Sequence, residues 1–124
     1  MRLLIVDDHA AMRRLLSRVV NDLFSVVVEC EDGADALAAY ERHRPDWVFM
    51  DIEMGRMDGI TATRDIRQVF PEARIVIVSK HDDKQLRAAA HTAGACGYVL
   101  KDNLIAVREL LEDRSHSGRS SIGE

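Results

Sequence analysis

Five polar residues each follow a short apolar run, and residues of these types could hold a metal ion and a phosphoryl group. The run "LLIV" ends at Asp7 and Asp8, and the run "WVFM" ends at Asp51. The runs "IVIV" and "YVL" end at Ser79 and Lys101. Because carboxylates are rarely buried without a partner, aspartates at the ends of apolar runs imply that a neutralising group lies nearby.

The three aspartates predict a site for a divalent cation. Carboxylates that share one place repel one another, and some stay protonated unless a cation joins them. Lys101 supplies only one positive charge, whereas oxygen ligands with water completing the shell suit Mg²⁺ best and also allow Mn²⁺. An aspartate can act as a nucleophile toward phosphorus, and a metal, a lysine and a hydroxyl would neutralise and orient the phosphoryl oxygens. The residue types therefore predict a Mg²⁺ site that can receive phosphate.

The elements that must bring these residues together alternate between strands and helices. Five apolar runs predict buried strands at 3–6, 26–28, 47–50, 75–78 and 98–100. Helical periodicity predicts helices at about 12–23, 34–41, 59–70, 82–93 and 103–112. This alternation predicts an α/β fold with a parallel sheet covered by helices on both sides. Ligands bind beyond the carboxyl ends of such strands, so the five polar residues would share one crevice if their strands were neighbours.

The same periodicity predicts which helical side chains face the sheet. The inner face of the first helix would comprise Met12, Leu15, Leu16, Val19, Val20 and Leu23. Its solvated face would comprise Arg13, Arg14 and Arg18. The apolar positions of the second helix would include Ala34, Leu37 and Ala38. We interpret His9 and His81 as solvated neighbours of the site, because the hard Mg²⁺ ion prefers oxygen ligands.

Length and composition are those of one globular domain. The chain has 124 residues, of which 47% are apolar and 31% charged. Its net charge of −4 argues against a general nucleic-acid surface. No apolar run approaches the roughly 20 residues of a membrane helix, and the early first strand leaves no room for a signal peptide. We therefore expect a cytoplasmic domain without membrane contact, in which Cys30 and Cys96 are buried thiols.

Five segments of the chain together carry a family resemblance. In chain order they are "LLIVDDHAAMRRLL", "DGADAL", "RPDWVFMDIEMGRMDGI", "IVIVSKHDD" and "GACGYVLKD". They resemble the receiver domain of bacterial two-component response regulators, and the segment "GYVLKD" is most similar to the NarL/LuxR-like subgroup with helix-turn-helix DNA-binding outputs. The resemblance implies a flavodoxin-like (βα)5 doubly wound parallel sheet with strand order 2-1-3-4-5. It also implies a receiver domain at 1–113, followed by a polar tail or the start of a linker at 114–124.

The resemblance gives each site residue an implied role. Asp51 would be the phosphoacceptor, and Lys101 and Ser79 would contact the phosphoryl group. The implied ligands of Mg²⁺, or alternatively Mn²⁺, are Asp7, Asp8, Asp51 and the backbone carbonyl of Glu53. Ser79 and Tyr98 would form the switch that responds to phosphate. The chain departs from the family pattern at Gly55, where the family usually has proline, and at Lys80, where it usually has a small residue.

The implied function is signalling rather than enzymatic turnover, although such a domain assists its own phosphorylation and dephosphorylation. Phosphate would pass from a sensor histidine kinase to Asp51 and change the surface of the fourth helix, fifth strand and fifth helix. A homodimer could form on phosphorylation. This domain itself would not bind nucleic acid, and DNA would be bound through a separate C-terminal domain.

Three alternatives compete with this interpretation. A stand-alone receiver would act by protein-protein contact alone. A small aspartate-based phosphohydrolase of the haloacid dehalogenase type would need Asp-x-Asp after the first strand and a cap insertion, whereas this chain has Asp7-Asp8 and no cap insertion. A flavin-binding protein would need a Gly-, Ser- and Thr-rich phosphate loop after the first strand, where this chain has the acidic "DDHAA".

Overall fold

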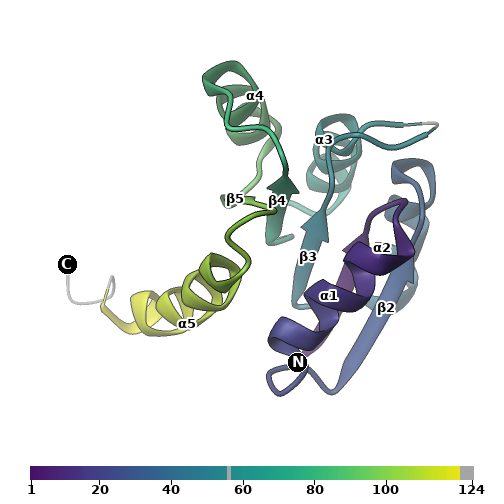
Figure 1. Cartoon of the computed structure of the whole chain (residues 1–124). Coiled ribbons are helices and arrows are strands. Elements are labelled where there is room, and N and C mark those ends of the chain that lie inside the picture. The colour runs from purple at the N-terminus through teal and green to yellow at the C-terminus, as the bar shows by residue number, and fades with distance from the viewer. Residues whose placement is uncertain (56, 121–124) are drawn as a thin grey trace.

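A parallel sheet of five strands runs through the centre of the molecule (Figure 1). The computed structural model describes the backbone of residues 1–55 and 57–120 and the side chains of residues 1–55 and 57–113. The strands are β1 (Arg2–Val6), β2 (Val26–Cys30), β3 (Trp47–Met50), β4 (Ile75–Ser79) and β5 (Gly97–Leu100). Their order is β2-β1-β3-β4-β5, which confirms the flavodoxin-like topology predicted from the sequence.

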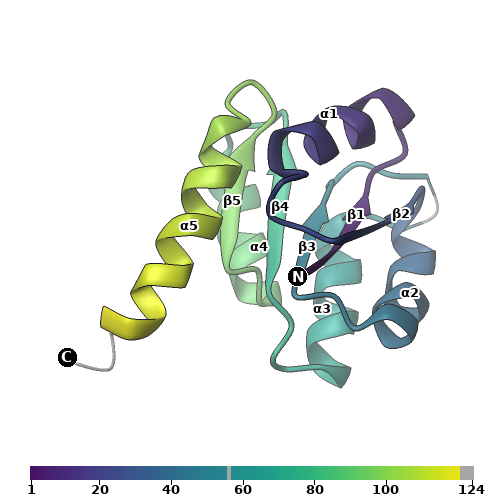
Figure 2. The same ribbon diagram turned by 90° about the horizontal axis from the view of Figure 1, so that it is seen from below.

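Helices cover both faces of this sheet (Figure 2). They are α1 (Ala10–Val20), the short 3-10 helix η1 (Gly33–Asp35), α2 (Ala36–His43), α3 (Gly59–Val69), α4 (Lys84–Ala93) and α5 (Ile105–Ser120). Side chains of α1 and α5 pack in one core cluster, and those of α2, α3 and α4 pack in the other. The two clusters are separated by the sheet because successive strand residues point to opposite faces. On β1, for example, Leu3 and Ile5 belong to the first cluster, and Leu4 and Val6 to the second.

Capping residues set the ends of α3 and α4. Asp58 is the N-cap of α3, and its carboxylate accepts a hydrogen bond from Thr61 N at 2.8 Å. Asp83 begins α4 and accepts hydrogen bonds from the backbone N–H groups of Gln85 and Leu86. Gly94 ends α4 with a φ of 108°, a left-handed conformation that favours glycine. The predicted roles of Asp58 and Gly94 as helix caps are confirmed.

The predicted faces of α1 and α2 are partly wrong. Leu15 is 45% exposed, because the buried stripe of α1 is narrower than predicted and centres on Leu16 and Val20. In α2 the buried residues are Ala36 and Tyr40. The 3-10 turn before α2 shifts the phase of the helix, so the predicted positions Ala34 and Ala38 are exposed.

Two helix ends also differ from the sequence prediction. The helix predicted to reach Leu23 ends at Val20, and a turn follows it. The last helix, predicted to end near residue 112, continues to Ser120, and its end extends past the sheet (Figure 2). Polar residues suffice to prolong a helix because adding a turn to an existing helix is far easier than starting one. The tail or linker predicted at 114–124 stays a prediction for 114–120, and 121–124 lie outside the described residues.

The prediction that the two cysteines are buried thiols is confirmed in part. Cys30 lies on β2 and Cys96 directly before β5, at opposite edges of the sheet. Neither is part of a disulfide, and both are half-buried rather than fully buried. Among the helices that the structure describes, none is long and apolar enough to cross a membrane.

Candidate functional site

The carboxyl ends of β1, β3, β4 and β5 bring the predicted site residues together. Asp51 N donates a hydrogen bond to Val6 O at 2.9 Å, which places the end of β3 beside the start of the loop after β1. Lys101 N donates to Ser79 O at 2.8 Å, which pairs the ends of β5 and β4 in the same way. The aspartates, the serine and the lysine therefore share one edge of the sheet, as the strand order predicts.

Lys101 bridges two buried carboxylates at this edge. Its Nζ lies 3.1 Å from Asp7 Oδ2 and 3.1 Å from Asp51 Oδ1. Asp7 is 1% exposed and Asp51 is 5% exposed. Burial, and then the charge of Asp7, raise the pKa of Asp51 above its ordinary value, although Lys101 opposes this shift. Burial alone would lower the pKa of Lys101, but the charges of Asp51 and Asp7 outweigh it and raise that pKa.

The acidic cluster carries more negative charge than Lys101 can balance. Asp7, Asp8, His9 and Asp51 each offer a ligand atom, and these four atoms lie within 4.8 Å of one another. Asp7 Oδ2 is buried, and within the described residues it has the ion pair with Lys101 but no further hydrogen bond. A buried carboxylate oxygen in this condition, beside two further carboxylates, fits a site for a divalent cation.

A cavity of about 640 Å³ opens above the cluster and gives Asp51 access to solvent. Acidic groups and two lysines line it together, and they include Asp8, Asp51, Glu53, Lys80 and Lys101. Lys80, the unusual residue after Ser79, is exposed at this mouth. The hydrogen bond from His81 is the main cause that lowers the pKa of Glu53, and the charge of Lys80 contributes.

Gly59 is a positioning residue of this site, although its place in the sequence indicated only the start of a helix. A Cβ atom at this position would lie 1.8 Å from the backbone oxygen of Asp51. Gly59 N also donates to Ile52 O at 2.8 Å, so α3 packs directly against the chain that carries Asp51. Glycine is unfavourable inside a helix, and its presence at the first helical position was the available signal of a close approach.

Asp32 and Arg13 connect the segments around the site through hydrogen bonds. Neither role was predicted from the sequence. Asp32 Oδ1 accepts hydrogen bonds from Ala34 N at 2.8 Å and Met57 N at 3.2 Å, which ties the loop after β3 to the turn after β2. Arg13 donates to Asp7 O at 2.6 Å and to Glu29 Oε1 at 2.7 Å. The side chain of Arg13 is only 11% exposed, so its prediction as part of a solvated helix face is wrong. The reason is that β2 brings Glu29 opposite α1, a contact that no local pattern in the sequence reveals.

The predicted switch residues are connected through the backbone of His81. Ser79 Oγ accepts a hydrogen bond from His81 N at 3.0 Å, and Tyr98 donates its hydroxyl hydrogen to His81 O at 2.7 Å. The ring of His81 contacts the carboxylate of Glu53 through Nε2, so His81 is not merely a solvated neighbour. The loop between β4 and α4 thus contacts the mouth of the acidic site on one side and Tyr98 on the other.

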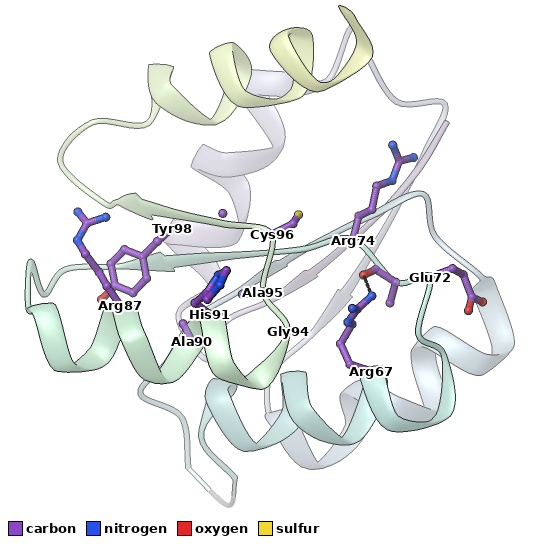
Figure 3. Close-up of a pocket in the computed structure, with 12 residues that line it drawn as sticks. Arg67, Glu72, Arg74, Arg87, Ala90, His91, Gly94, Ala95, Cys96 and Tyr98 are labelled. Atoms are coloured by element: carbon purple, nitrogen blue, oxygen red, sulfur yellow. Dashed lines mark hydrogen bonds between the residues drawn. The ribbon is translucent and has the colours of Figure 1, made fainter. Parts of the chain in front are cut away.

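A second cavity, of about 590 Å³, lies between α3, α4 and the start of β5 (Figure 3). We call it the arginine-lined cavity, because Arg67, Arg74 and Arg87 are among its lining residues. Arg67 donates to the carbonyls of Pro71 and Ala73. The dashed line in Figure 3 marks the hydrogen bond to Ala73 O. Tyr98 also lines this cavity, and its hydroxyl donates to the loop that contacts the mouth of the acidic site.

Comparison with known proteins gives consistent matches over most of the chain. The family model described as response regulator receiver domain matches residues 3–113. The chemotaxis protein CheY of Bacillus subtilis (strain 168) is 44% identical over 101 residues, which cover 81% of this chain and 84% of that protein. The transcriptional regulatory protein DegU of Brevibacillus brevis is 36% identical over 103 residues, which cover 82% of this chain and 44% of that protein.

Solved structures agree with these sequence matches. A two-component response regulator of the LuxR family from Aurantimonas sp. SI85-9A1 superposes with a TM-score of 0.83 at 34% identity. That superposition covers 90% of this chain and 82% of the other chain. The chain spans about half of the length of the transcriptional regulators among its curated relatives, and most of the length of the chemotaxis protein.

Proposed function

This chain belongs to the family of response regulator receiver domains, and we propose that Asp51 is its phosphoacceptor, that Lys101 and Ser79 assist, and that phosphate comes from a sensor histidine kinase. In the transfer, a carboxylate oxygen of Asp51 forms a bond to phosphorus while the bond between phosphorus and the donor nitrogen breaks. The kinase histidine then takes up a proton. The observation that carries the proposal is the 3.1 Å contact of Lys101 Nζ with a buried Asp51 that borders an open cavity.

Lys101 and Ser79 have separate tasks in this proposal. The ammonium group of Lys101 neutralises charge on the phosphoryl group, which is the main requirement of phosphoryl transfer. The hydroxyl of Ser79 can donate to a phosphoryl oxygen, because its present hydrogen bond uses only its oxygen as an acceptor for His81 N. Donation to the phosphoryl group would draw the loop after β4 toward Asp51.

We propose Mg²⁺ as the resident cation, with Mn²⁺ as an alternative. Asp7, Asp8, Asp51 and the backbone carbonyl of Glu53 would hold it, and oxygen donors of this kind suit a hard cation. The buried Asp7 Oδ2 shares the single charge of Lys101 with Asp51 and has no further hydrogen bond within the described residues, which supports the assignment. When bound, the ion would neutralise charge on the phosphoryl oxygens.

The signal would leave the site through Tyr98. Tyr98 donates to the carbonyl of His81, in the loop that Ser79 would move, so a shift of this loop changes the surroundings of the ring. We propose that phosphorylation alters the surface of α4, β5 and α5, and that a homodimer can form through the altered surface. The domain acts in the cytoplasm without membrane contact, as a signalling module rather than a turnover enzyme.

The output of this domain has two candidates. The similarity to DegU, a transcriptional regulator, supports control of an attached DNA-binding domain, while the receiver itself contacts no nucleic acid. The similarity to a chemotaxis protein over 84% of that protein's length supports the alternative, a stand-alone receiver that acts by protein contact.

Phosphorylation by acetyl phosphate tests the assignment of Asp51. Intact mass should increase by one phosphoryl group in the presence of Mg²⁺ and stay unchanged with a chelator. Asp51→Asn should abolish the increase. Asp58→Asn is the matched control, because Asp58 lines the same cavity but caps α3, and asparagine also serves as a cap. Modification that persists in Asp51→Asn would refute the assignment.

Hydrogen exchange tests the proposed switch. Phosphorylated wild type should change its exchange between Ser79 and Lys101, and phosphorylated Ser79→Ala should lose that change. If both proteins change alike, Ser79 is not the link and the signal runs through another contact, with Lys101 as the next candidate.

A further inference from the structure

His9 lies at the rim of the acidic cluster with a ring nitrogen directed at the carboxylates. Its Nδ1 is 2.9 Å from Asp8 Oδ1 and 3.4 Å from Asp7 Oδ1. The imidazole is 72% exposed, so water and ions reach it freely. It belongs to the group of four residues whose potential ligand atoms lie within 4.8 Å of one another.

These separations fit the edges of a metal coordination shell. With bonds of about 2.1 Å, adjacent ligands of an octahedral ion lie roughly 3.0 Å apart and opposite ligands roughly 4.2 Å apart. A simple hydrogen bond from His9 would account for the contact with Asp8. The same ring nitrogen also lies 3.4 Å from Asp7 Oδ1, in a cluster whose two buried carboxylates share only the charge of Lys101, so it is placed to complete a ligand set with both aspartates.

The backbone holds His9 in place while its ring stays adjustable. His9 precedes α1 in an extended conformation, with φ −102° and ψ 111°, and its N–H donates to Asp7 Oδ1 at 2.9 Å. Its own side chain makes no hydrogen bond that caps the helix. The exposed ring can therefore rotate over the carboxylates without disturbing the helix or the loop.

We propose that His9 is a nitrogen ligand for divalent transition metals at this site, in addition to the carboxylates. The inference rests on the proposed metal site and adds to it the class of ion that the site prefers. Imidazole suits Co²⁺, Ni²⁺, Cu²⁺ and Zn²⁺, whereas Mg²⁺ and Mn²⁺ favour carboxylate, carbonyl and water oxygens. His9 coordinates a bound transition metal directly but is not a ligand of bound Mg²⁺. The identity of the ion therefore determines whether the residue that precedes α1 is bonded to the metal.

The affinity for different ions should separate the two modes. Loss of a direct ligand should weaken binding at least as much as loss of an outer-shell partner, which costs roughly 10- to 100-fold. In His9→Asn the dissociation constant for Co²⁺, measured by calorimetry, should therefore rise about tenfold or more. The constant for Mg²⁺ should change less than about twofold, since the ion keeps oxygen and water ligands. Asparagine is a preferred residue before a helix, so α1 should be preserved.

Pulsed electron paramagnetic resonance of bound Cu²⁺ provides the decisive experiment, because imidazole suits this ion and coupling to an imidazole ¹⁴N nucleus appears only when the ring is coordinated. Wild type should show this coupling, and His9→Asn should lose it. The matched control is His91→Asn, because His91 lines the arginine-lined cavity and should leave the spectrum unchanged.

The outcomes separate this inference from the proposed function. Bound Cu²⁺ without ¹⁴N coupling in wild type, or coupling that persists in His9→Asn, would overturn the role of His9 and leave the carboxylate site intact. Failure of wild type to bind Mn²⁺ or Mg²⁺ at all would overturn the proposed metal site itself. Equal weakening of Co²⁺ and Mg²⁺ binding in His9→Asn would also contradict the inference, because it would indicate general damage to the site.

Discussion

The acidic site and the arginine-lined cavity have similar volumes and opposite charge, and they differ in whether their charged groups are already satisfied. In the acidic site, two buried carboxylates share one lysine, and Asp7 Oδ2 has no hydrogen bond beyond this ion pair in the described part of the structure. In the arginine-lined cavity, Arg67 donates to two carbonyls of the loop after α3 (Figure 3). Arg74 lies over the ring of Trp47 and donates to Asp46 O.

The difference indicates which cavity is built for a ligand. An arginine that bonds to nearby carbonyls stabilises a loop and has already found its partners. A buried carboxylate with too little positive charge costs free energy, which a cation or a phosphoryl group with its metal can recover. The concentration of charge alone therefore does not identify a functional site, whereas unbalanced buried charge does.

A pair of glycine substitutions should sharpen this comparison with the largest effects. Gly59→Ala should lower the free energy of unfolding by more than about 3 kcal/mol, because the new Cβ would overlap the backbone oxygen of Asp51, which cannot move aside cheaply. Gly97→Ala, at the arginine-lined cavity, should cost about 1 kcal/mol, because its Cβ meets only a terminal methyl of Leu110. Urea denaturation of both variants measures the difference, and equal costs would show that the acidic site is no more rigid than the other cavity.

The next effect comes from removing one cation from each cavity. Lys101→Met leaves two buried carboxylates unpaired and should cost about 3 kcal/mol at neutral pH. Arg67→Met removes contacts with uncharged carbonyls and should cost about 1 kcal/mol. Thermal unfolding with and without Mg²⁺ distinguishes them further, because only Lys101→Met should recover stability as the ion is added. Recovery in Arg67→Met would remove the distinction between the cavities.

The sequence predicts the site better than it predicts the supports of the site. Asp7, Asp51, Ser79 and Lys101 are identifiable because each lies at the end of a short apolar strand, and parallel strands end at one edge. The strand order depended on the family resemblance, since the alternation of strands and helices is compatible with several orders.

The supporting residues could not be found because their partners are distant in the sequence. Arg13 has the pattern of a solvated helix residue, and only the position of β2 brings Glu29 to it. Asp32 contacts Met57 N across 25 positions of the chain. The face of α2 was wrong for a different reason, since a single 3-10 turn shifts a helical pattern that is otherwise regular.

Neutralising Asp51 should produce a smaller and opposite effect. Burial and Asp7 raise the pKa of Asp51, so the folded state binds this proton more tightly than the unfolded state does. Stability from this group is therefore fully present below its ordinary pKa of 3.8 and is lost as pH rises through the raised folded pKa. Asp51→Asn removes that loss and should be more stable than wild type at neutral pH by about 1 kcal/mol.

Unfolding across a range of pH measures this effect. The advantage of Asp51→Asn should shrink as the pH falls toward 3.8, and Mg²⁺ should reduce it at neutral pH because the ion stabilises the wild-type carboxylates. A stability difference between Asp51→Asn and wild type that stays constant with pH would mean that burial does not destabilise the ionised Asp51. The contrast between the unbalanced acids of one cavity and the hydrogen-bonded arginines of the other would then fail.

The smallest effect should come from Arg87, which lies next to Tyr98. Its guanidinium lies 4.6 Å from the centre of the Tyr98 ring and 3.0 Å from Asp82 Oδ1. An exposed ion pair contributes about 0–1 kcal/mol and an exposed cation–π contact about 0.5–1 kcal/mol, so Arg87→Met should lower stability by less than about 1 kcal/mol. Mg²⁺ affinity and phosphorylation of Asp51 should be unchanged, since Arg87 reaches neither carboxylate of the acidic site. Calorimetric titration with Mg²⁺ and intact mass after acetyl phosphate treatment test both expectations. A change in either would mean that Tyr98 couples the arginine-lined cavity to the acidic site before any phosphate is bound, and the two cavities would then act as one unit.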